Sequence, residues 1–300
     1  ISGIMNEIGI ALVGVGEIAQ NFHLKTLVHQ PDVRLIAVHD KMNSRAKSIA
    51  EKFDIPYVCE NMDELLALDE IQAVDICTTT DAHSELACRA LEAGKNVLIE
   101  KPIARSLDET RKILEAEKNS KGRVMVGMTQ RFRYDTIMLK NYVHSGEIGD
   151  VFYVKAGWLQ QKRGKEWLDQ IDVSGGGVLL DLGISMIDSL MWIYDFAPIL
   201  SVKATTFQHK TKSVEDVCVC SLHFKSGSIA TLEASWTLFS DKTNFYCDVY
   251  GSNGAASINP VRLYKSDGNK FYPAPESPER SNITILRKSF ESEIRHFINA

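Results

Sequence analysis

The sequence predicts a two-domain α/β protein, in which an N-terminal doubly wound parallel sheet precedes a C-terminal α+β domain with a large, mostly antiparallel sheet. Two observations predict this fold class. Up to about residue 125, apolar runs of strand length alternate with helical patterns, which is typical of parallel βαβ units. Beyond that point, strand-like runs of alternating polarity follow one another with turn residues between them, as in antiparallel sheets. We therefore expect domains over residues 1–125 and 126–300.

The elements of the first domain are predicted from apolar periodicity and from stop signals. Short, near-continuous apolar runs indicate strands that are buried on both faces. Pro31 follows the end of the first helix, Asp81 is expected to cap the fourth helix, and Gly94 ends it. The expected strands span residues 8–13, 33–39, 56–59, 73–78, 97–99 and 124–128, and the expected helices span residues 17–29, 44–53, 62–67, 82–93 and 107–120.

The second domain is predicted to begin with two helices, at residues 135–145 and 183–194. Three prolines predict a loop over residues 272–280, and a final helix is expected over residues 289–298. An open sheet with an apolar face needs a partner surface, so we expect a homo-oligomer, a dimer or tetramer, assembled through this sheet. The expected strands span residues 199–208, 214–225, 227–238, 245–251, 254–259 and 261–265.

Composition and charge exclude several classes of protein. The 300 residues carry a net charge of −5, and the lysines and arginines form no run, which argues against a nucleic-acid partner. No apolar stretch reaches the roughly 18 residues of a membrane span, and no signal peptide is recognisable. The six cysteines form no CxxC pair and no compact ligand cluster appears, so we expect reduced thiols, a cytoplasmic location and no metal.

A glycine-rich turn follows the first predicted strand and opens the first predicted helix. Gly14, Gly16 and Ala19 form a GxGxxA pattern, with Glu17 and Ile18 inside it. The first glycine permits a tight turn, the second lets the backbone approach a pyrophosphate, and the small alanine permits close helix–strand packing. This context predicts a Rossmann dinucleotide site that includes all five residues. The alternative is an ordinary strand–helix turn.

Polar residues at two later strand ends extend the predicted cofactor site. Asp40 ends the second strand, where a carboxylate binds the adenosine ribose hydroxyls and repels a 2′-phosphate, which favours NAD over NADP. Lys41 follows directly and could soften that discrimination. Thr78 and Thr79 end the fourth strand at the carboxyl edge of the sheet, where doubly wound folds bind ligands. Helix or turn capping is the alternative for these side chains.

Six segments carry motifs that together resemble one family. They are Gly14–Ala19, Thr80–His83, Ala90–Pro102, Ser145–Gly149, Gly175–Gly183 and Val214–Asp216. They resemble the Gfo/Idh/MocA oxidoreductases, the family of glucose–fructose oxidoreductase and inositol dehydrogenase. The resemblance covers nearly the whole chain, and its Glu-Lys-Pro and Gly-Gly-Gly…Asp-x-Gly motifs are fairly specific in combination.

The resemblance implies an NAD(P)-dependent oxidoreductase that acts on CH–OH groups of a sugar, an inositol or a related polyol. It implies that Lys101 of the Glu-Lys-Pro motif reaches the substrate hydroxyl and the nicotinamide ribose, with Glu100 beside the cofactor. Asp181 falls where the family has a substrate-site aspartate, and Gln130 where it has a polar residue near the nicotinamide and substrate. His83 lies at the start of a predicted helix, at the edge of the sheet where the cofactor is expected to bind, and is expected to contact it. Lys101 is then the expected base, because hydride transfer from an alcohol requires loss of the hydroxyl proton.

One position departs from the family pattern. Ser185 stands four residues after Asp181, where the dehydrogenases carry histidine or tyrosine, and serine does not exchange protons near neutral pH unaided. Ser185 is expected to hydrogen-bond the substrate instead. Lys162 and Trp167, with Trp158, precede the glycine run and are candidates to line a polyol pocket, with packing or surface roles as the alternatives.

Two further functions stay open on the sequence. A non-catalytic sensor that binds NAD(H) and regulates a partner fits the missing histidine. A reductase of a non-sugar compound, such as a dihydrodiol or a bilin, would need a more apolar pocket than the lysine and arginine near residues 162–165 suggest.

Overall fold

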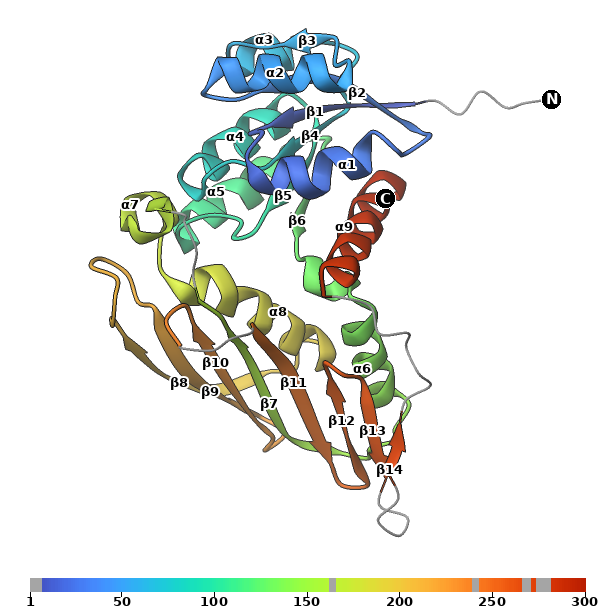
Figure 1. The fold of residues 1–300 in the computed structure, drawn as a ribbon, viewed down its shortest axis with the longest axis vertical. Coiled ribbons are helices and arrows are strands. Elements are labelled where there is room, and N and C mark those ends of the chain that lie inside the picture. Colours follow the sequence, from blue (N-terminus) through green and yellow to red (C-terminus); the bar gives the residue numbers. More distant parts are fainter. Residues whose placement is uncertain (1–6, 162–165, 239–242, 266–270, 274–281) are drawn as a thin grey trace, which may run out of the picture. The chain divides into compact units, whose positions relative to one another are not determined.

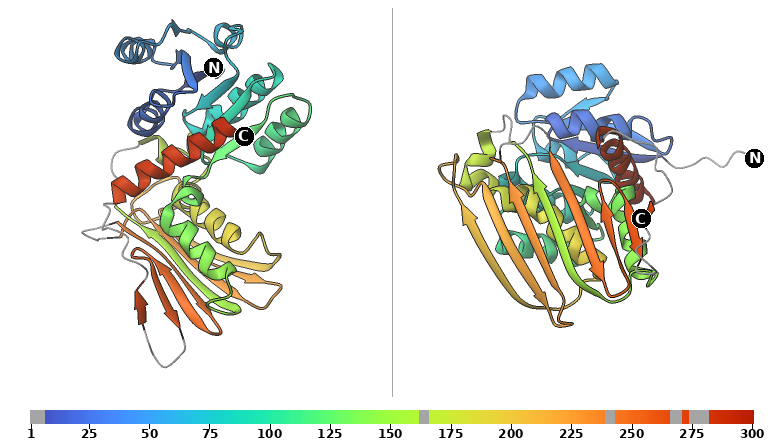
Figure 2. Two further views of the ribbon diagram at one scale, coloured as in Figure 1. Left: turned by 90° about the vertical axis from the view of Figure 1, so that its right-hand side faces the viewer. Right: turned by 60° about the horizontal axis from the view of Figure 1, so that its bottom comes forward.

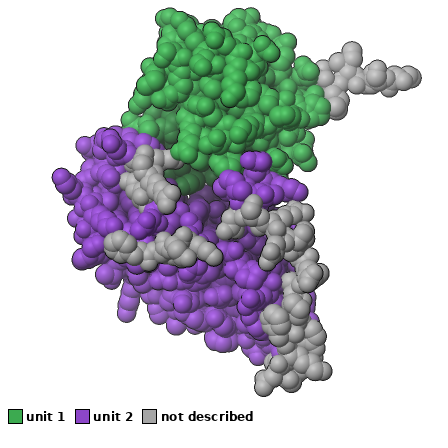
Figure 3. Space-filling view, in the orientation of Figure 1, with its two compact units in different colours: residues 1–127, 290–300 green, residues 128–289 purple. Residues whose placement is uncertain are grey.

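The computed structural model describes residues 7–161, 166–238, 243–265, 271–273 and 282–300. The chain forms two compact units, coloured separately in Figure 3. The first comprises residues Ile1–Gly127 together with Phe290–Ala300, and the second comprises Met128–Ser289. The predicted division at residue 125 did not foresee that the end of the chain returns to the first unit.

A six-stranded parallel sheet forms the centre of the first unit, as predicted (Figure 1). Its strand order is β3-β2-β1-β4-β5-β6. The order reverses between β1 and β4, and in doubly wound folds ligands bind at the carboxyl ends of the strands beside such a reversal. The strands are β1 (Ile8–Val13), β2 (Val33–His39), β3 (Tyr57–Val58), β4 (Ala73–Ile76), β5 (Asn96–Glu100) and β6 (Val124–Gly127).

Helices follow the strands of this sheet much as the periodicity predicts. The first consists of a π-helical turn, η1 (Ala19–His23), that continues directly into α1 (Leu24–Leu27). Asp81 lies in the first turn of α4 and is not its cap, because the helix begins at Thr80, two residues earlier than predicted, with Thr79 at the N-cap position. The remaining helices are α2 (Asn43–Phe53), α3 (Met62–Leu66), α4 (Thr80–Glu92) and α5 (Leu107–Lys118).

The C-terminal helix α9 (Asn282–Asn299) completes the first unit with its last turns. Its Ile294 is fully buried in an apolar cluster with Ile10 of β1 and Leu98 of β5. Phe290 stacks on Phe22 with ring centroids 4.5 Å apart. These contacts tie the end of the chain to the parallel sheet.

An eight-stranded sheet forms the second unit, in the order β14-β13-β12-β11-β7-β10-β9-β8 (Figure 2). Strands β7 and β10 pair in parallel and the other neighbours pair antiparallel. Helices α6 (Tyr134–His144) and α8 (Ile184–Ile193) supply side chains to the apolar cluster on one face of it. The strands are β7 (Val151–Leu159), β8 (Ile199–Phe207), β9 (Val217–Phe224), β10 (Ile229–Ser235), β11 (Asn244–Gly251), β12 (Gly254–Ile258), β13 (Arg262–Lys265) and β14 (Phe271–Pro273).

Three parts of the second half differ from the sequence prediction. Strand β7 was not predicted, although it lies in the middle of the sheet, because Lys155 and Gly157 interrupt its apolar pattern. Gly157 leaves room for the ring of Tyr246, whose Cε1 an added Cβ would meet at 2.5 Å. Strand β14 overlaps the start of the predicted loop at residues 272–280, and most of that loop lies outside the described residues. Helix α9 begins at Asn282, seven residues earlier than predicted.

One helical stretch of the described residues, Ile171–Ile193, is long and apolar enough to cross a membrane by length and composition alone. Half of its most apolar window is buried inside the protein. Met186, Leu190 and Ile193 belong to the apolar cluster beneath the eight-stranded sheet. We interpret the stretch as a core helix.

Candidate functional site

The glycine turn connects β1 to the first helix, as the sequence predicts. Gly14 has a φ of +84°, and a Cβ there would lie 2.8 Å from the backbone of Cys77. At Gly16 an added Cβ would meet nothing within 4 Å among the described atoms. The buried Ala19 begins the helix against the apolar cluster that contains Leu12. The first glycine is therefore required by the fold, whereas the second keeps open a space in front of the helix, where a pyrophosphate fits.

This difference predicts that substitution of Gly14 lowers stability, whereas substitution of Gly16 weakens cofactor binding. Gly14→Ala is expected to lower the free energy of unfolding by about 2–4 kcal/mol, because it adds a side chain at positive φ against a backbone. Gly16→Val is expected to leave that free energy nearly unchanged but to weaken NAD binding about 100-fold or more, because its side chain fills the space kept for the phosphates. Urea unfolding and calorimetric titration measure the two effects. Equal loss of stability in both variants would contradict the assignment.

Asp40 follows β2 and is tied to the glycine turn. Its Oδ2 accepts a hydrogen bond from the backbone N–H of Val15 at 2.9 Å, and its Oδ1 accepts one from Met42 at 2.8 Å. The guanidinium of Arg45 lies 3.5 Å from Oδ2. Each carboxylate oxygen has two lone pairs, so these bonds leave acceptor capacity for a ribose hydroxyl. Lys41, next in the chain, is exposed.

The ring of His83, on α4, lies between the segments that follow β4 and β5. Its Nδ1 lies 2.8 Å from the carbonyl oxygen of Pro102, and its Nε2 lies 3.3 Å from that of Thr78. Burial lowers the pKa of His83, so the neutral ring donates from Nδ1 to the nearer carbonyl. Thr78 donates its own hydroxyl to the carbonyl of Thr79. His83 thus hydrogen-bonds the segment after β5, while its Nε2 faces the segment after β4; its contact with a cofactor stays a prediction.

Lys101 follows β5 directly, next to Glu100. The backbone N–H of Lys101 donates to Glu100 Oε2 at 3.1 Å. Because β1, β4 and β5 are neighbours and parallel, Gly14, Thr78 and Lys101 lie at the same edge of one sheet. The residues predicted for the cofactor in the first domain therefore gather where a dinucleotide binds in this kind of fold.

Asp181 lies in the second unit, in the π-helical turn η4 (Leu179–Gly183) that leads into α8. The indole Nε1–H of Trp236 donates to Asp181 Oδ2 at 3.0 Å. Glu215 accepts hydrogen bonds from the backbone N–H groups of Gly177 and Leu179, which precede Asp181. Glu215 of the Val214–Asp216 motif thus stabilises the start of the helix that the glycine run forms.

The other predicted residues of the second unit take different positions. Ser185 is buried on α8, four residues beyond Asp181. Gln130 lies in the 3-10 turn η2 (Thr129–Phe132) with 5% exposure, and its Oε1 has no hydrogen-bond partner among the described residues. Trp167, in the 3-10 turn η3 (Glu166–Asp169), packs against the apolar cluster around Trp236. Lys162 lies outside the described residues.

Comparison with known proteins places the chain in a family. Residues 8–128 match an oxidoreductase family with an NAD-binding Rossmann fold, and residues 136–257 match the GFO/IDH/MocA C-terminal domain. Inositol 2-dehydrogenase of Rhizobium meliloti (strain 1021) is 30% identical over 96% of this chain and 87% of its own length. The chain belongs to the Gfo/Idh/MocA oxidoreductase family. The predicted resemblance is thereby confirmed.

One further relative and one solved structure are also similar to this oxidoreductase. D-glucoside 3-dehydrogenase of Escherichia coli (strain K12) is 26% identical over 96% of this chain and 84% of its own length. The solved structure of GenD2 from gentamicin A biosynthesis in complex with NAD superimposes with a TM-score of 0.86 at 23% identity. That match covers 100% of this chain and 87% of the other, and it confirms the predicted fold class.

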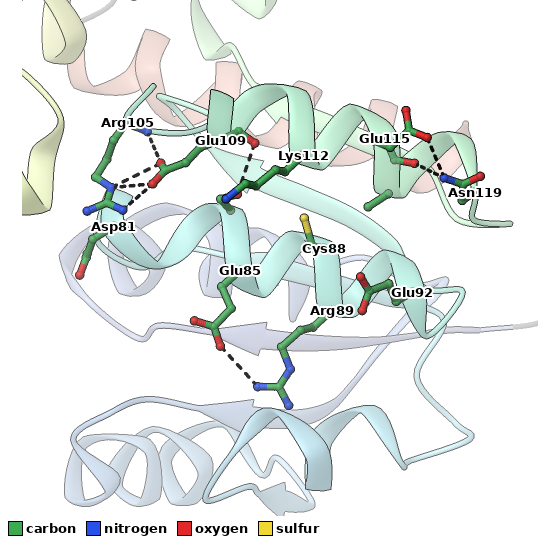
Figure 4. Close-up of a pocket in the computed structure, with 12 residues that line it drawn as sticks. Asp81, Glu85, Cys88, Arg89, Glu92, Arg105, Glu109, Lys112, Glu115 and Asn119 are labelled. Atoms are coloured by element: carbon green, nitrogen blue, oxygen red, sulfur yellow. Dashed lines mark hydrogen bonds and ion pairs between the residues drawn. The ribbon is translucent and has the colours of Figure 1, made fainter. Parts of the chain in front are cut away.

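A cavity of about 750 Å³ in this family member lies between α4 and α5, away from the glycine turn (Figure 4). Charged side chains that line it are paired with each other, as in Arg105 with Glu109 and Arg89 with Glu85. None of its lining residues comes from the turn around Gly14–Ala19. We therefore do not assign the cofactor to it.

Two residues that the sequence did not assign to the site contact residues predicted for it: Trp236 contacts Asp181, and His23 contacts Glu100. Neither Trp236, within the predicted strand at residues 227–238, nor His23 belongs to a motif that pointed to the site. His23 in fact bridges Asp75 and Glu100 with its two ring nitrogens. His23, Asp75 and Cys77 have donor atoms close enough for a metal ion. Since hydrogen bonds account for both ring nitrogens, the absence of a metal stays our prediction.

Proposed function

We propose that this chain is an NAD-dependent dehydrogenase that oxidises a CH–OH group of an inositol, a sugar or a related polyol to the carbonyl, or catalyses the reverse reduction. The single observation that carries the proposal is the position of Lys101 at the carboxyl edge of the parallel sheet, directly after β5, which β4 separates from the strand that leads into the glycine turn. Relatives named for inositol and D-glucoside dehydrogenation support the substrate class.

The cofactor and the protein have separate roles in the proposed reaction. The glycine turn and Asp40 would hold NAD⁺, which would supply the hydride acceptor for the alcohol carbon. The amine of Lys101 accepts the hydroxyl proton as the carbon–oxygen double bond forms, so that one C–H bond and one O–H bond break for each carbonyl made. The protein thus supplies the proton acceptor and the positioning.

Asp181 is our second functional assignment. An ionised carboxylate accepts hydrogen bonds from hydroxyl groups, and the Trp236 indole N–H, which donates to Oδ2, fixes the orientation of the Asp181 carboxylate. We infer that Asp181 orients the polyol. Gln130, with its unpartnered buried oxygen, is proposed to accept from the nicotinamide amide or a substrate hydroxyl, and Ser185 is proposed to hydrogen-bond the substrate.

A second candidate function rests on Ser185. The buried serine cannot exchange protons near neutral pH, which would suit a sensor that binds NAD(H) without turnover. The two functions differ in one measurement. A dehydrogenase forms NADH when a substrate is added, whereas a sensor binds the dinucleotide and forms none with any compound.

The proposal is tested by NADH absorbance with a panel of inositols, aldoses and glycosides, each paired with its deoxy analogue. We expect substrate-dependent NADH formation with at least one polyol and none with the analogue that lacks the reacting hydroxyl. Tight NAD binding without NADH from any member of the panel would instead support the sensor. Turnover confined to apolar dihydrodiols would support the non-sugar reductase.

Asp40 is proposed to select NAD over NADP. Asp40→Asn keeps an oxygen for the Val15 N–H but removes the charge that repels a 2′-phosphate, and Arg45 then lies beside that phosphate. We expect the ratio of the Kd for NADP to the Kd for NAD to fall about 10-fold or more. Calorimetric titration with both cofactors measures it, with Asp63→Asn, at a carboxylate 90% exposed on α3, as control. An unchanged ratio would remove Asp40 from the cofactor assignment.

We also propose a homo-oligomer, a dimer or tetramer, formed through the eight-stranded sheet, and a cytoplasmic location. Large apolar side chains on its strands are exposed in the single chain, among them Phe152 at 58%, Phe207 at 63% and Val219 at 51%. Such groups are rarely left in water in large numbers. Light scattering of the purified protein tests the oligomeric state.

A further inference from the structure

His23 lies inside the parallel-sheet unit, between two acidic residues. It ends the π-helical turn η1, and its side chain is 1% exposed. Its Nδ1 is 2.8 Å from Oδ2 of Asp75 on β4, and its Nε2 is 3.0 Å from Oε1 of Glu100 at the end of β5. Both ring nitrogens therefore face carboxylate oxygens.

This arrangement favours a doubly protonated ring between two ionised carboxylates. An ionised carboxylate only accepts hydrogen bonds, and a neutral imidazole has one donor and one lone pair, so it would turn that lone pair toward one of the two acids. Burial alone would lower the pKa of His23, but the charge and hydrogen bond of Asp75 raise it well above the usual value. Burial would likewise raise the pKa of Glu100, but the His23 hydrogen bond and charge outweigh it, and that pKa is lowered.

The surroundings of His23 contain few other titratable groups. Cys77, directly after β4, stays a neutral thiol, because burial raises its pKa. On α9 the ring of Phe290 lies 5.4 Å from the imidazole, and Glu293 is buried less than one turn further along the helix. Lys101 follows Glu100 in the chain. His23 is thus enclosed mainly by acidic groups and an aromatic ring.

Glu100 connects His23 to Lys101. One of its oxygens contacts the imidazole, and the other accepts the backbone N–H of Lys101 at 3.1 Å. Hydrogen bonds therefore fix the Glu100 side chain at both oxygens. Through Glu100, they also fix the backbone of Lys101. If the imidazole lost its charge, two buried carboxylates would lack a counter-ion and one would take up a proton.

We propose that His23 is a positioning residue of the dehydrogenase: its positive charge keeps Glu100 ionised and bonded to the backbone of Lys101, and turnover needs His23 in this charged form. The inference rests on the proposed function. It predicts that activity falls at high pH as His23 loses its proton. This fall is separate from the rise in activity with pH that is expected as Lys101, the base, loses its proton.

The charge state is tested first, without any turnover. Imidazole ¹⁵N shifts of the isotope-labelled full chain report it, with the signals assigned by His23→Gln and by His29→Gln, an exposed histidine on the same segment. We expect His23 to remain doubly protonated above about pH 7, where an ordinary histidine with a pKa of about 6.5 is neutral. A neutral His23 at that pH overturns the inference whether or not the protein is an enzyme.

Stability provides a second readout with a definite sign. The folded pKa of His23 is raised, so its contribution is complete below about pH 6.5 and is lost as pH rises through the folded value. The lowered pKa of Glu100 gives a contribution present above about pH 4.5 and lost on acidification. The urea midpoint of the wild type should therefore fall above about pH 6.5 by more than that of His23→Gln. Parallel midpoints would contradict a charged His23.

Turnover tests the positioning role. In His23→Gln we expect kcat to fall about 10–100-fold with little change in the KM for NAD, and the high-pH decline to disappear. Adding Glu100→Gln should restore part of kcat, because a neutral amide needs no counter-charge and still accepts from the Lys101 N–H. If His23 only fills space, the double variant will be no better than the single one and the pH profile will keep its shape. If His23→Gln does not fold, the wild-type titration decides.

Discussion

Replacing Lys101 by methionine is expected to lower kcat by about 1,000-fold and to raise the Kd for NAD by far less, through loss of its predicted contact with the nicotinamide ribose. Methionine keeps the length and apolar stem of the lysine but cannot accept a proton. The loss should fall mainly on the chemical step, because the glycine turn and Asp40 that we assign to the cofactor are untouched. Single-turnover kinetics and calorimetric titration measure the two quantities.

Lys118→Met is the matched control, since that lysine is 73% exposed at the end of α5. It should turn over as the wild type does. A Lys101→Met enzyme that retained most of its kcat would show that another group takes the proton. A parallel loss of NAD binding would instead give Lys101 a role in cofactor binding alone.

Asp181→Asn is expected to lower kcat/KM for the polyol about 10–100-fold, the effect of losing a hydrogen bond to a charged group. The asparagine has nearly the same shape, so the η4 turn should keep its structure and NAD affinity should not change. Trp236→Phe should lower kcat/KM less, by about 10-fold or below, because it keeps the ring in its cluster and removes only the Nε1–H that holds Asp181.

The two variants together distinguish direct contact of Asp181 with the substrate from the positioning of Asp181 by Trp236. If Asp181 contacts substrate and Trp236 acts only through it, the double variant should be no worse than Asp181→Asn alone. Strictly additive losses would show that Trp236 acts by another route. No change in either single variant would remove Asp181 from the site.

The first half of the fold could be predicted because its signals are local. The glycine turn, the strand before it and the helix after it are adjacent in sequence, and Gly14 is required by a backbone contact that such turns share. Asp40 could be predicted for the same reason, since it ends the next strand along. Lys101 and Asp181 came from motifs of a family, and the family is confirmed.

The rest depends on contacts between distant parts of the chain. His23 meets acids that are 52 and 77 residues away, so no local pattern shows that it is bridged on both sides. The apolar pattern of strand β7 is interrupted at Gly157, where the ring of Tyr246 from strand β11 leaves no room for a side chain. The return of α9 to the first unit depends on Ile294 meeting Ile10, which periodicity within the helix does not show. Such pairings follow from tertiary structure alone.

The most direct test of the proposed dehydrogenation is the fate of the hydrogen on the reacting carbon. A polyol substrate carrying deuterium at that carbon is incubated with NAD⁺ and the enzyme, and the nicotinamide product is examined by mass spectrometry and NMR. We predict one deuterium in the reduced cofactor, on a single face of the ring, with none lost to water, and no labelled product from Lys101→Met in the same time. Deuterium released to solvent, or unlabelled NADH, would contradict direct hydride transfer and with it the function proposed for this chain.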